Sequence, residues 1–195
     1  MADASARSRV PERRVILSGE SPIYTVGHST RPIADFVGLL LRGPAELVGD
    51  VRTIPRSRRN PQYNEDVLGT ELAGYQIGYV RISGLGGFRG HSAGLSSEVN
   101  AFWENRSFHN YADYALSAGF EAALGELMQA SVSRSCAIMC AEAVWWRCHR
   151  RIIADYLLVR GRSVFHLMGS DRVEPARLTS AARVQDGRIV YPRTS

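Results

Sequence analysis

The stretch IYTVGHST at residues 23–30 decides the fold class, because an apolar run of strand length stops abruptly at Gly27-His28-Ser29. Thr30 can then cap a helix that opens near Pro32 and gathers its apolar residues on one face. The same order of elements repeats along the chain. Further strand-like runs lie at residues 46–51, 79–82, 136–139 and 163–167, and helical periodicity lies at residues 65–76, 108–116, 120–128 and 148–159.

Short apolar strands that alternate with helices are typical of a mostly parallel sheet covered on both faces. The sequence therefore predicts a three-layer α/β fold, Rossmann-like, with a five-stranded sheet between helices. One domain fits residues 23–170. We expect residues 1–22, rich in Ala, Ser and Arg, to form a flexible N-terminal arm. Residues 171–195 form a C-terminal extension that packs on the domain or is irregular, with an edge strand at 188–191.

Composition narrows the functional class. The chain has 195 residues and a net charge of +5, and every one of its 24 cationic side chains is arginine. The lack of lysine excludes Schiff-base chemistry and a phosphate-loop lysine, whereas arginine suits bidentate recognition of phosphate. The three cysteines are an odd number, the N-terminus has no apolar core of a secretory signal, and no apolar run approaches membrane length. These features predict a cytoplasmic protein with reduced thiols and no membrane partner.

Reactive side chains follow the ends of the predicted strands. Ligands of open α/β sheets bind at the carboxyl ends of the strands, so we expect these side chains to meet at one site. His166 ends the last strand. The candidates for catalysis are Asp50, Cys148, His28 and Glu142. The candidates for substrate or anion binding are Ser29, Arg52, Arg56, Ser57, Gly86, Gly87, Cys140, His149 and Arg150.

The second strand ends in Asp50-Val51-Arg52, where a buried carboxylate is costly unless it is paired, hydrogen-bonded or used. We do not expect Arg52 to be its automatic partner, because it follows so closely along the strand. The loop at residues 55–59 then supplies a proline, a hydroxyl and three guanidinium groups, a composition that suits phosphate. A merely solvated loop is the alternative.

The densest cluster of reactive residues runs from Cys140 to Arg151. Cys148 falls near a helix N-terminus and among arginines, which favours a thiolate and bound anions. Cys148 can be a nucleophile, a redox partner of Cys140, a metal ligand or a packed core thiol. No second paired motif completes a four-ligand set, so the sequence predicts no metal site and no cofactor. His149 can assist, although adjacent helical residues do not share a face.

The ordered motifs resemble those of the domain of unknown function 488 family. The family pattern of GHS, DVR-x-x-P-x-S, LGG, C-x-E and CHR appears here at residues 27–29, 50–57, 85–87, 140–142 and 148–150. The resemblance covers roughly residues 23–170 and implies a compact α/β fold of cytosolic, mainly prokaryotic proteins. It implies no particular activity.

Three functional hypotheses follow. The first is an enzyme acting on a phosphate-bearing or nucleic-acid-derived substrate at the strand ends. The second is a non-catalytic module that binds a nucleotide or nucleic acid through the arginines. The third is a thiol redox or metal-binding protein. The partner expected under the first two is an anionic small molecule or nucleic acid, and the sequence leaves the oligomeric state open.

Overall fold

A six-stranded sheet forms the centre of the structure, a computed structural model that describes residues 21–169 and 172–193. The strand order is β3-β2-β4-β1-β5-β6, and all neighbours are parallel except the last pair. The strands are β1 (Ile23–Gly27), β2 (Leu47–Asp50), β3 (Gly78–Arg81), β4 (Cys136–Cys140), β5 (Val164–Leu167) and β6 (Val173–Pro175). The mostly parallel α/β fold is thus confirmed, with one short antiparallel strand, β6, more than the sequence predicted.

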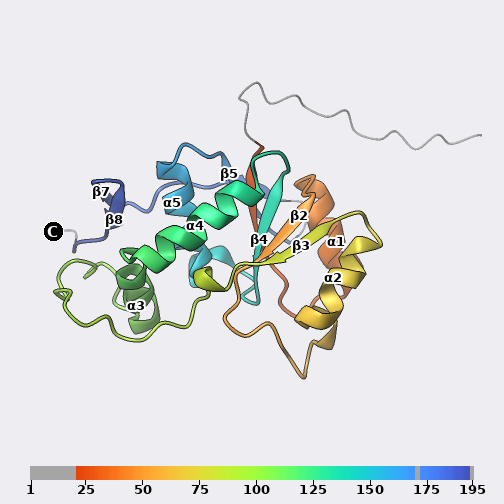
Figure 1. The fold of residues 1–195 in the computed structure, drawn as a ribbon, viewed down its shortest axis with the longest axis horizontal. Coiled ribbons are helices and arrows are strands. Elements are labelled where there is room, and N and C mark those ends of the chain that lie inside the picture. Colours follow the sequence, from red (N-terminus) through yellow and green to blue (C-terminus); the bar gives the residue numbers. More distant parts are fainter. Residues whose placement is uncertain (1–20, 170–171, 194–195) are drawn as a thin grey trace, which may run out of the picture.

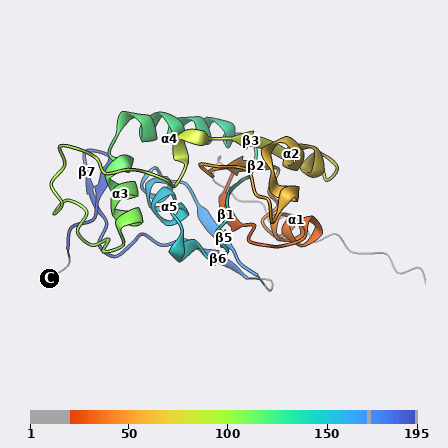
Figure 2. The same ribbon diagram turned by 90° about the horizontal axis from the view of Figure 1, so that it is seen from below.

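Helices cover both faces of the sheet, so the fold has three layers (Figures 1 and 2). Successive side chains of a strand point to opposite faces of the sheet. In β4, Ile138 therefore packs in the apolar cluster on one face and Met139 in the cluster on the other. The pair α1 and α2 packs in the cluster with Met139, and α3, α4 and α5 pack in the cluster with Ile138. The helices are α1 (Ile33–Arg42), α2 (Glu65–Ala73), α3 (Arg106–Ala115), α4 (Ala118–Ala130) and α5 (Arg150–Val159).

Helix α1 begins after Pro32, and no side chain caps its N-terminus, so the cap expected from Thr30 is absent. Three short 3-10 helices complete the elements between the strands. They are η1 (Pro61–Tyr63), η2 (Ser83–Leu85) and η3 (Trp145–Arg147). None of the helices in the described part of the chain is long and apolar enough to cross a membrane.

The described part of the C-terminal extension packs on the domain. A hairpin of β7 (Arg183–Gln185) and β8 (Arg188–Val190) lies beside α5, and Ile189 and Tyr191 are completely buried. The Tyr191 hydroxyl donates to the buried Asp155 carboxylate of α5 at 3.0 Å. A strand does form at the predicted position 188–191, namely β8, but it pairs with β7 in a separate two-stranded sheet and not at the edge of the main sheet. The N-terminal arm predicted at residues 1–22 lies almost wholly outside the described residues.

The strand order also brings the ends of β1 and β4 together. These strands are neighbours in the sheet, and beyond them the His28 N–H donates to the Cys140 carbonyl at 3.0 Å. Gly27 is required at this crossing, because a Cβ there would lie 1.9 Å from the Glu142 carbonyl oxygen. The glycine of the GHS motif therefore allows the loops after β1 and β4 to run in contact.

Candidate active site at the carboxyl edge of the sheet

A cavity of about 370 Å³ opens where the loops after β2, β3 and β4 meet the N-terminal ends of α3 and α5. Its lining comes from five separate segments of the chain. The lining residues are Arg52, Thr53, Ile54, Gly87, Phe88, Asn105, Ser107, Phe108, Cys140, Ala141, Glu142, Arg147, Cys148 and His149. A more open hollow near the C-terminal hairpin, about 760 Å³, contains none of the predicted site residues. Six of the sequence-predicted site residues line the smaller cavity, namely Arg52, Gly87, Cys140, Glu142, Cys148 and His149.

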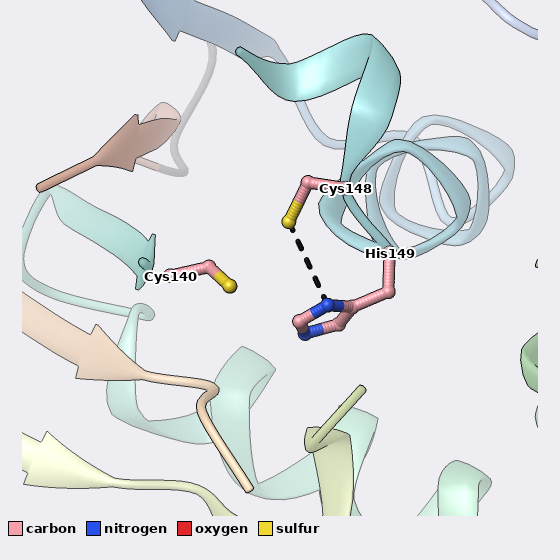
Figure 3. Close-up of side chains that lie close together, drawn as sticks. All are labelled: Cys140, Cys148 and His149. Atoms are coloured by element: carbon pink, nitrogen blue, oxygen red, sulfur yellow. Dashed lines mark hydrogen bonds between the residues drawn. The ribbon is translucent and has the colours of Figure 1, made fainter. Parts of the chain in front are cut away.

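Two thiols and an imidazole meet on the cavity wall (Figure 3). The Cys140 Sγ, the Cys148 Sγ and one ring nitrogen of His149 all lie within 4.8 Å of one another. The Cys148 Sγ is 3.6 Å from the His149 Nδ1 and accepts a hydrogen bond from the Arg150 Nε at 3.2 Å. Cys148 and His149 do face each other, because Cys148 precedes the helix in an extended conformation and the helical rule does not apply to it.

The orientation of His149 is fixed on two sides. Its Nε2 lies 3.0 Å from the Val51 carbonyl oxygen, which can only accept, so Nε2 carries a proton and donates it. Gly87 leaves room for the ring, since a Cβ at Gly87 would lie 2.5 Å from Nδ1. The other ring nitrogen, Nδ1, therefore points at Cys148.

The local charges favour a thiolate on Cys148. Burial on its own would raise the pKa of Cys148, but the hydrogen bond from Cys140 and the positive charges of Arg150 and His149 take that pKa well below its usual range. The hydrogen bond to Cys148, and then burial, raise the pKa of Cys140. Within the pair, these interactions favour the proton on Cys140 and the negative charge on Cys148.

Arg150, the positively charged partner of Cys148, is buried as well. It is only 1% exposed, and its Nη2 donates to the Glu142 carbonyl at 2.6 Å while its Nε donates to Cys148. The guanidinium thus ties the loop after β4 to the start of α5. This arrangement holds the charge beside Cys148 Sγ with little freedom to move.

Arg52 reaches the cavity from a second buried network. Its Nε and Nη2 donate to the two carboxylate oxygens of Asp50, at 2.9 Å to Oδ1 and 2.6 Å to Oδ2. The Tyr79 hydroxyl donates to the same carboxylate at 2.8 Å. The expectation that Arg52 is not the partner of Asp50 was wrong, because residues two apart point to the same side of an extended chain. Asp50 is fully buried behind Arg52 and does not line the cavity.

His28 supports Arg52 from the β1 side. Its ring stacks on Tyr63 with 4.0 Å between centroids, its Nδ1 donates to the Ser29 carbonyl at 2.8 Å, and its Nε2 faces the Arg52 Nη1 at 3.2 Å. Burial and then the charge of Arg52 lower the pKa of His28 to about 4. His28 is therefore neutral at pH 7 and accepts from Arg52, outside the cavity lining.

The remaining predicted residues divide between the cavity and its surroundings. Glu142 lines the cavity, whereas Arg56 is exposed on the loop beyond it. The Ser57 Oγ accepts from the Asn60 N–H at 3.1 Å and so serves the loop itself. Gly86 packs on Thr53, and the Ser29 N–H donates to the Ala141 carbonyl at 3.0 Å.

His166 reaches the same end of the sheet but not the cavity. Its Nδ1 lies 2.8 Å from the Thr25 Oγ1, and its ring stacks on Trp145 at 4.2 Å between centroids. Trp146 is 46% exposed, and neither tryptophan lines the cavity. The aromatic side chains that line the cavity are instead Phe88 and Phe108.

Sequence reasoning missed three kinds of site residue. Tyr63, in η1, stacks on His28, and Tyr79, in β3, donates to Asp50, and no sequence motif marks either tyrosine. Phe88 is an exposed aromatic residue in the loop after η2. A lone aromatic residue in a loop is a signal that could have marked it as a candidate. Asn105 caps α3 by accepting from the N–H groups of Ser107 and Phe108, a capping pattern that is readable in the sequence.

The fold and the site together define an α/β protein with a buried thiol cluster at the carboxyl edge of a parallel sheet. The family model described as domain of unknown function DUF488 matches residues 32–157, which is more than half of the chain. The chain therefore belongs to the DUF488 family. The Gly27-His28-Ser29 motif lies just before the matched range. No curated protein and no solved structure is significantly similar to this chain.

Proposed function

We propose that this protein is a thiol-dependent enzyme that acts on a phosphate-bearing or nucleic-acid-derived substrate, with Cys148 as the nucleophile. The observation that carries the proposal is the position of the Cys148 Sγ, on the wall of a cavity and 3.2 Å from the Arg150 guanidinium. A thiolate is the reactive form of cysteine, and a neighbouring cation and imidazole are what maintain it.

The side chains around Cys148 have distinct roles in this proposal. Arg150 stabilises the thiolate, and His149, whose Nδ1 is 3.6 Å from the Cys148 Sγ, exchanges protons with the nucleophile or leaving group. Glu142, on the same cavity wall, is a second proton carrier. Asp50 and His28, which the sequence suggested as catalytic residues, become positioning residues, because both contact Arg52 rather than the cavity.

The lining of the cavity supports an anionic substrate with an apolar part. Arg52 and Arg147 supply positive charge, and the N-terminal ends of α3 and α5 point partial positive charge at the same space. Ile54 and Phe88 line the cavity and are 61% and 76% exposed, so they can cover a flat ring. A nucleotide combines these two features, a base and a phosphate.

The reaction proposed is a nucleophilic displacement. The Cys148 Sγ attacks an electrophilic atom of the substrate, a covalent thio intermediate forms, and the bond to the leaving group breaks with its electron pair on the leaving group. His149 gives the leaving group a proton. Water then attacks the intermediate, transfers a proton back to His149 and releases the thiolate.

The experiment is a turnover assay over phosphomonoesters, nucleotides and short oligonucleotides, with intact-mass detection of the covalent intermediate. We expect Cys148→Ser to abolish both turnover and the adduct. Cys136→Ser is the matched control, because Cys136 is a buried free thiol of the core at the other end of β4. Activity retained in Cys148→Ser would contradict the proposal.

A non-catalytic nucleic-acid-binding module is the second candidate, and one observation favours it. Arg56, Arg58 and Arg59 are all exposed on the loop between β2 and α2. Exposed arginines contact phosphates without any chemistry. This candidate needs binding but no thiolate, so substitution of Cys148 distinguishes it from the enzyme.

We also propose a cytoplasmic location. All three cysteines are free thiols in the structure, including two that lie within 4.8 Å of each other. Reduced neighbouring thiols persist in a reducing compartment.

A further inference from the structure

The Cys140–Cys148–His149 cluster has a second property that the proposed enzyme does not use. Its three donor atoms, two sulfurs and one imidazole nitrogen, are of the kind that soft and borderline metal ions prefer, and they lie within 4.8 Å of one another. We propose that Cys140, Cys148 and His149 form a binding site for one Zn²⁺ ion, with the fourth coordination position open to the cavity. The site stands on this geometry and does not rest on the proposed function.

The donors are close to the separations that the metal needs. Tetrahedral Zn²⁺ has Zn–S distances of about 2.3 Å and Zn–N distances of about 2.0 Å, which place its ligand atoms roughly 3.5–3.8 Å apart. The largest separation in the cluster, 4.8 Å, must therefore shrink by about 1 Å. Side-chain rotation suffices for such a change, since Figure 3 shows both sulfurs and the ring pointing into one common space.

The surroundings already orient the ligands. A histidine that binds a metal usually donates its other ring N–H to a carbonyl or carboxylate, and the His149 Nε2 is 3.0 Å from the Val51 carbonyl oxygen. Nδ1 is thereby left to bind the ion. The Arg150 Nε donates to the Cys148 Sγ, which is how outer groups stabilise a metal-bound thiolate. The positive charge of Arg150 opposes the ion, and the two thiolates offset it.

All three ligand residues also line the cavity, so the remaining position of the ion faces space that a water or a ligand can enter. Three protein ligands and one open position are the pattern of an accessible zinc ion. A Cys148 sulfur bound to Zn²⁺ is no longer a free nucleophile. The metal and a substrate that reacts with Cys148 therefore exclude each other.

The test uses the full chain, reduced and stripped of metal, and Zn²⁺ or Co²⁺ as the probe. We expect one Zn²⁺ per chain, and with Co²⁺ the sulfur-to-cobalt charge-transfer absorption of a thiolate-bound ion. Cys140→Ser and His149→Gln should each lower the Zn²⁺ affinity by about 100-fold or more, since even outer-shell changes cost 10–100-fold. Cys136→Ser, the core thiol outside the cluster, should bind Zn²⁺ like the wild-type chain.

A second measurement requires no variant of the cluster. In the wild-type chain, bound Zn²⁺ should protect Cys140 and Cys148 from alkylation and should leave Cys136 unchanged. The proposal is overturned if Zn²⁺ does not bind, if it binds equally well to Cys140→Ser and His149→Gln, or if it fails to protect the two thiols. Failure of the proposed enzyme would look different, as a Cys148 that does not react even without metal.

Discussion

Asp50 and Arg52, two residues apart at the end of β2, form a buried ion pair in which the Arg52 Nη2 lies 2.6 Å from the Asp50 Oδ2. The DVR motif is therefore a unit. Its carboxylate lies behind the sheet edge, and its guanidinium faces the cavity. The Arg52 Nη2 also donates to the Tyr63 carbonyl at 2.7 Å. The Asp50 carboxylate and the Tyr63 carbonyl thus hold in place the guanidinium that faces the cavity from the loop after β2.

This pair predicts that Asp50→Asn destabilises the fold. The substitution leaves the buried Arg52 charge without its counter-ion, and breaking a buried pair costs about 3–5 kcal/mol. Urea unfolding measures the loss. Glu65→Gln is the matched control, because the Arg81–Glu65 pair is partly exposed at 3.0 Å and should contribute no more than about 1 kcal/mol. An Asp50→Asn chain with wild-type stability and no activity would instead identify Asp50 as a catalytic residue.

Gly87→Ala should impair the site with little effect on the fold. A Cβ at Gly87 would lie 2.5 Å from the His149 Nδ1, so the ring must move by about 1 Å, a displacement that can lower a rate by about 100-fold. The rate of Cys148 alkylation and the turnover number are the readouts. Gly90→Ala, in the same loop, has open space at its Cβ and should match the wild type. Equal rates for both variants would show that the position of His149 is unimportant.

The stability of the protein should fall when the pH drops below about 6.5. Burial, and then the charge of Arg150, lower the pKa of His166 in the folded chain to about 4. Between that value and the unfolded pKa of about 6.5, the unfolded chain binds the proton and the folded chain does not. This contribution is complete above pH 6.5, and about 3 kcal/mol of it is lost by pH 4.

Unfolding free energies measured from about pH 7 to pH 4 test this dependence. His166→Gln should remove about half of the decline, because the pKa of His28 is also lowered to about 4 and gives a like contribution. His91→Gln, a change at an exposed histidine, should leave the decline unchanged. A wild-type stability that does not change over this range would mean that His166 is protonated as readily in the folded chain as in the unfolded one.

The loop between β2 and α2, with its three exposed arginines, allows a test of nucleic-acid binding. If Arg56, Arg58 and Arg59 each neutralise a phosphate, changing all three to Ser should reduce the slope of log affinity against log salt by roughly 2 to 3. Fluorescence anisotropy with a single-stranded oligonucleotide measures this slope. Binding that is absent, or equally salt-dependent in the triple variant, would eliminate the loop as a nucleic-acid contact.

The sequence predicted the sheet well, because four of its parallel strands, β1, β2, β4 and β5, are almost entirely buried and read as short, largely apolar runs. Strand β6 was missed for the opposite reason, since Val173 and Pro175 are exposed and only three residues pair with β5. The meeting of His28, Arg52 and Cys148 at one edge follows from the parallel order alone.

The sequence did not predict which of the residues at that edge line the cavity and which are buried behind it. Which candidates face the cavity depends on side-chain direction just beyond the strands, where no periodic pattern applies. The Asp50 carboxylate binds Arg52 and Tyr79 and does not face the cavity. Cys148 has an extended backbone, so helical spacing does not predict where its side chain points. The long segment between β3 and α3 supplies Phe88 and Asn105, which both lie outside the strand and helix periodicities that guided the predictions.

The most direct test of the account is the alkylation of each cysteine by iodoacetamide in the native, metal-free chain, measured by peptide mass spectrometry near pH 6, about 2.5 units below the pKa of an ordinary thiol. The account predicts that Cys148 is labelled first and faster than a small free thiol at the same pH, while Cys136 is labelled only after unfolding. Labelling of Cys148 no earlier than Cys136 would contradict it, because a thiolate on the cavity wall must react before a thiol of the core.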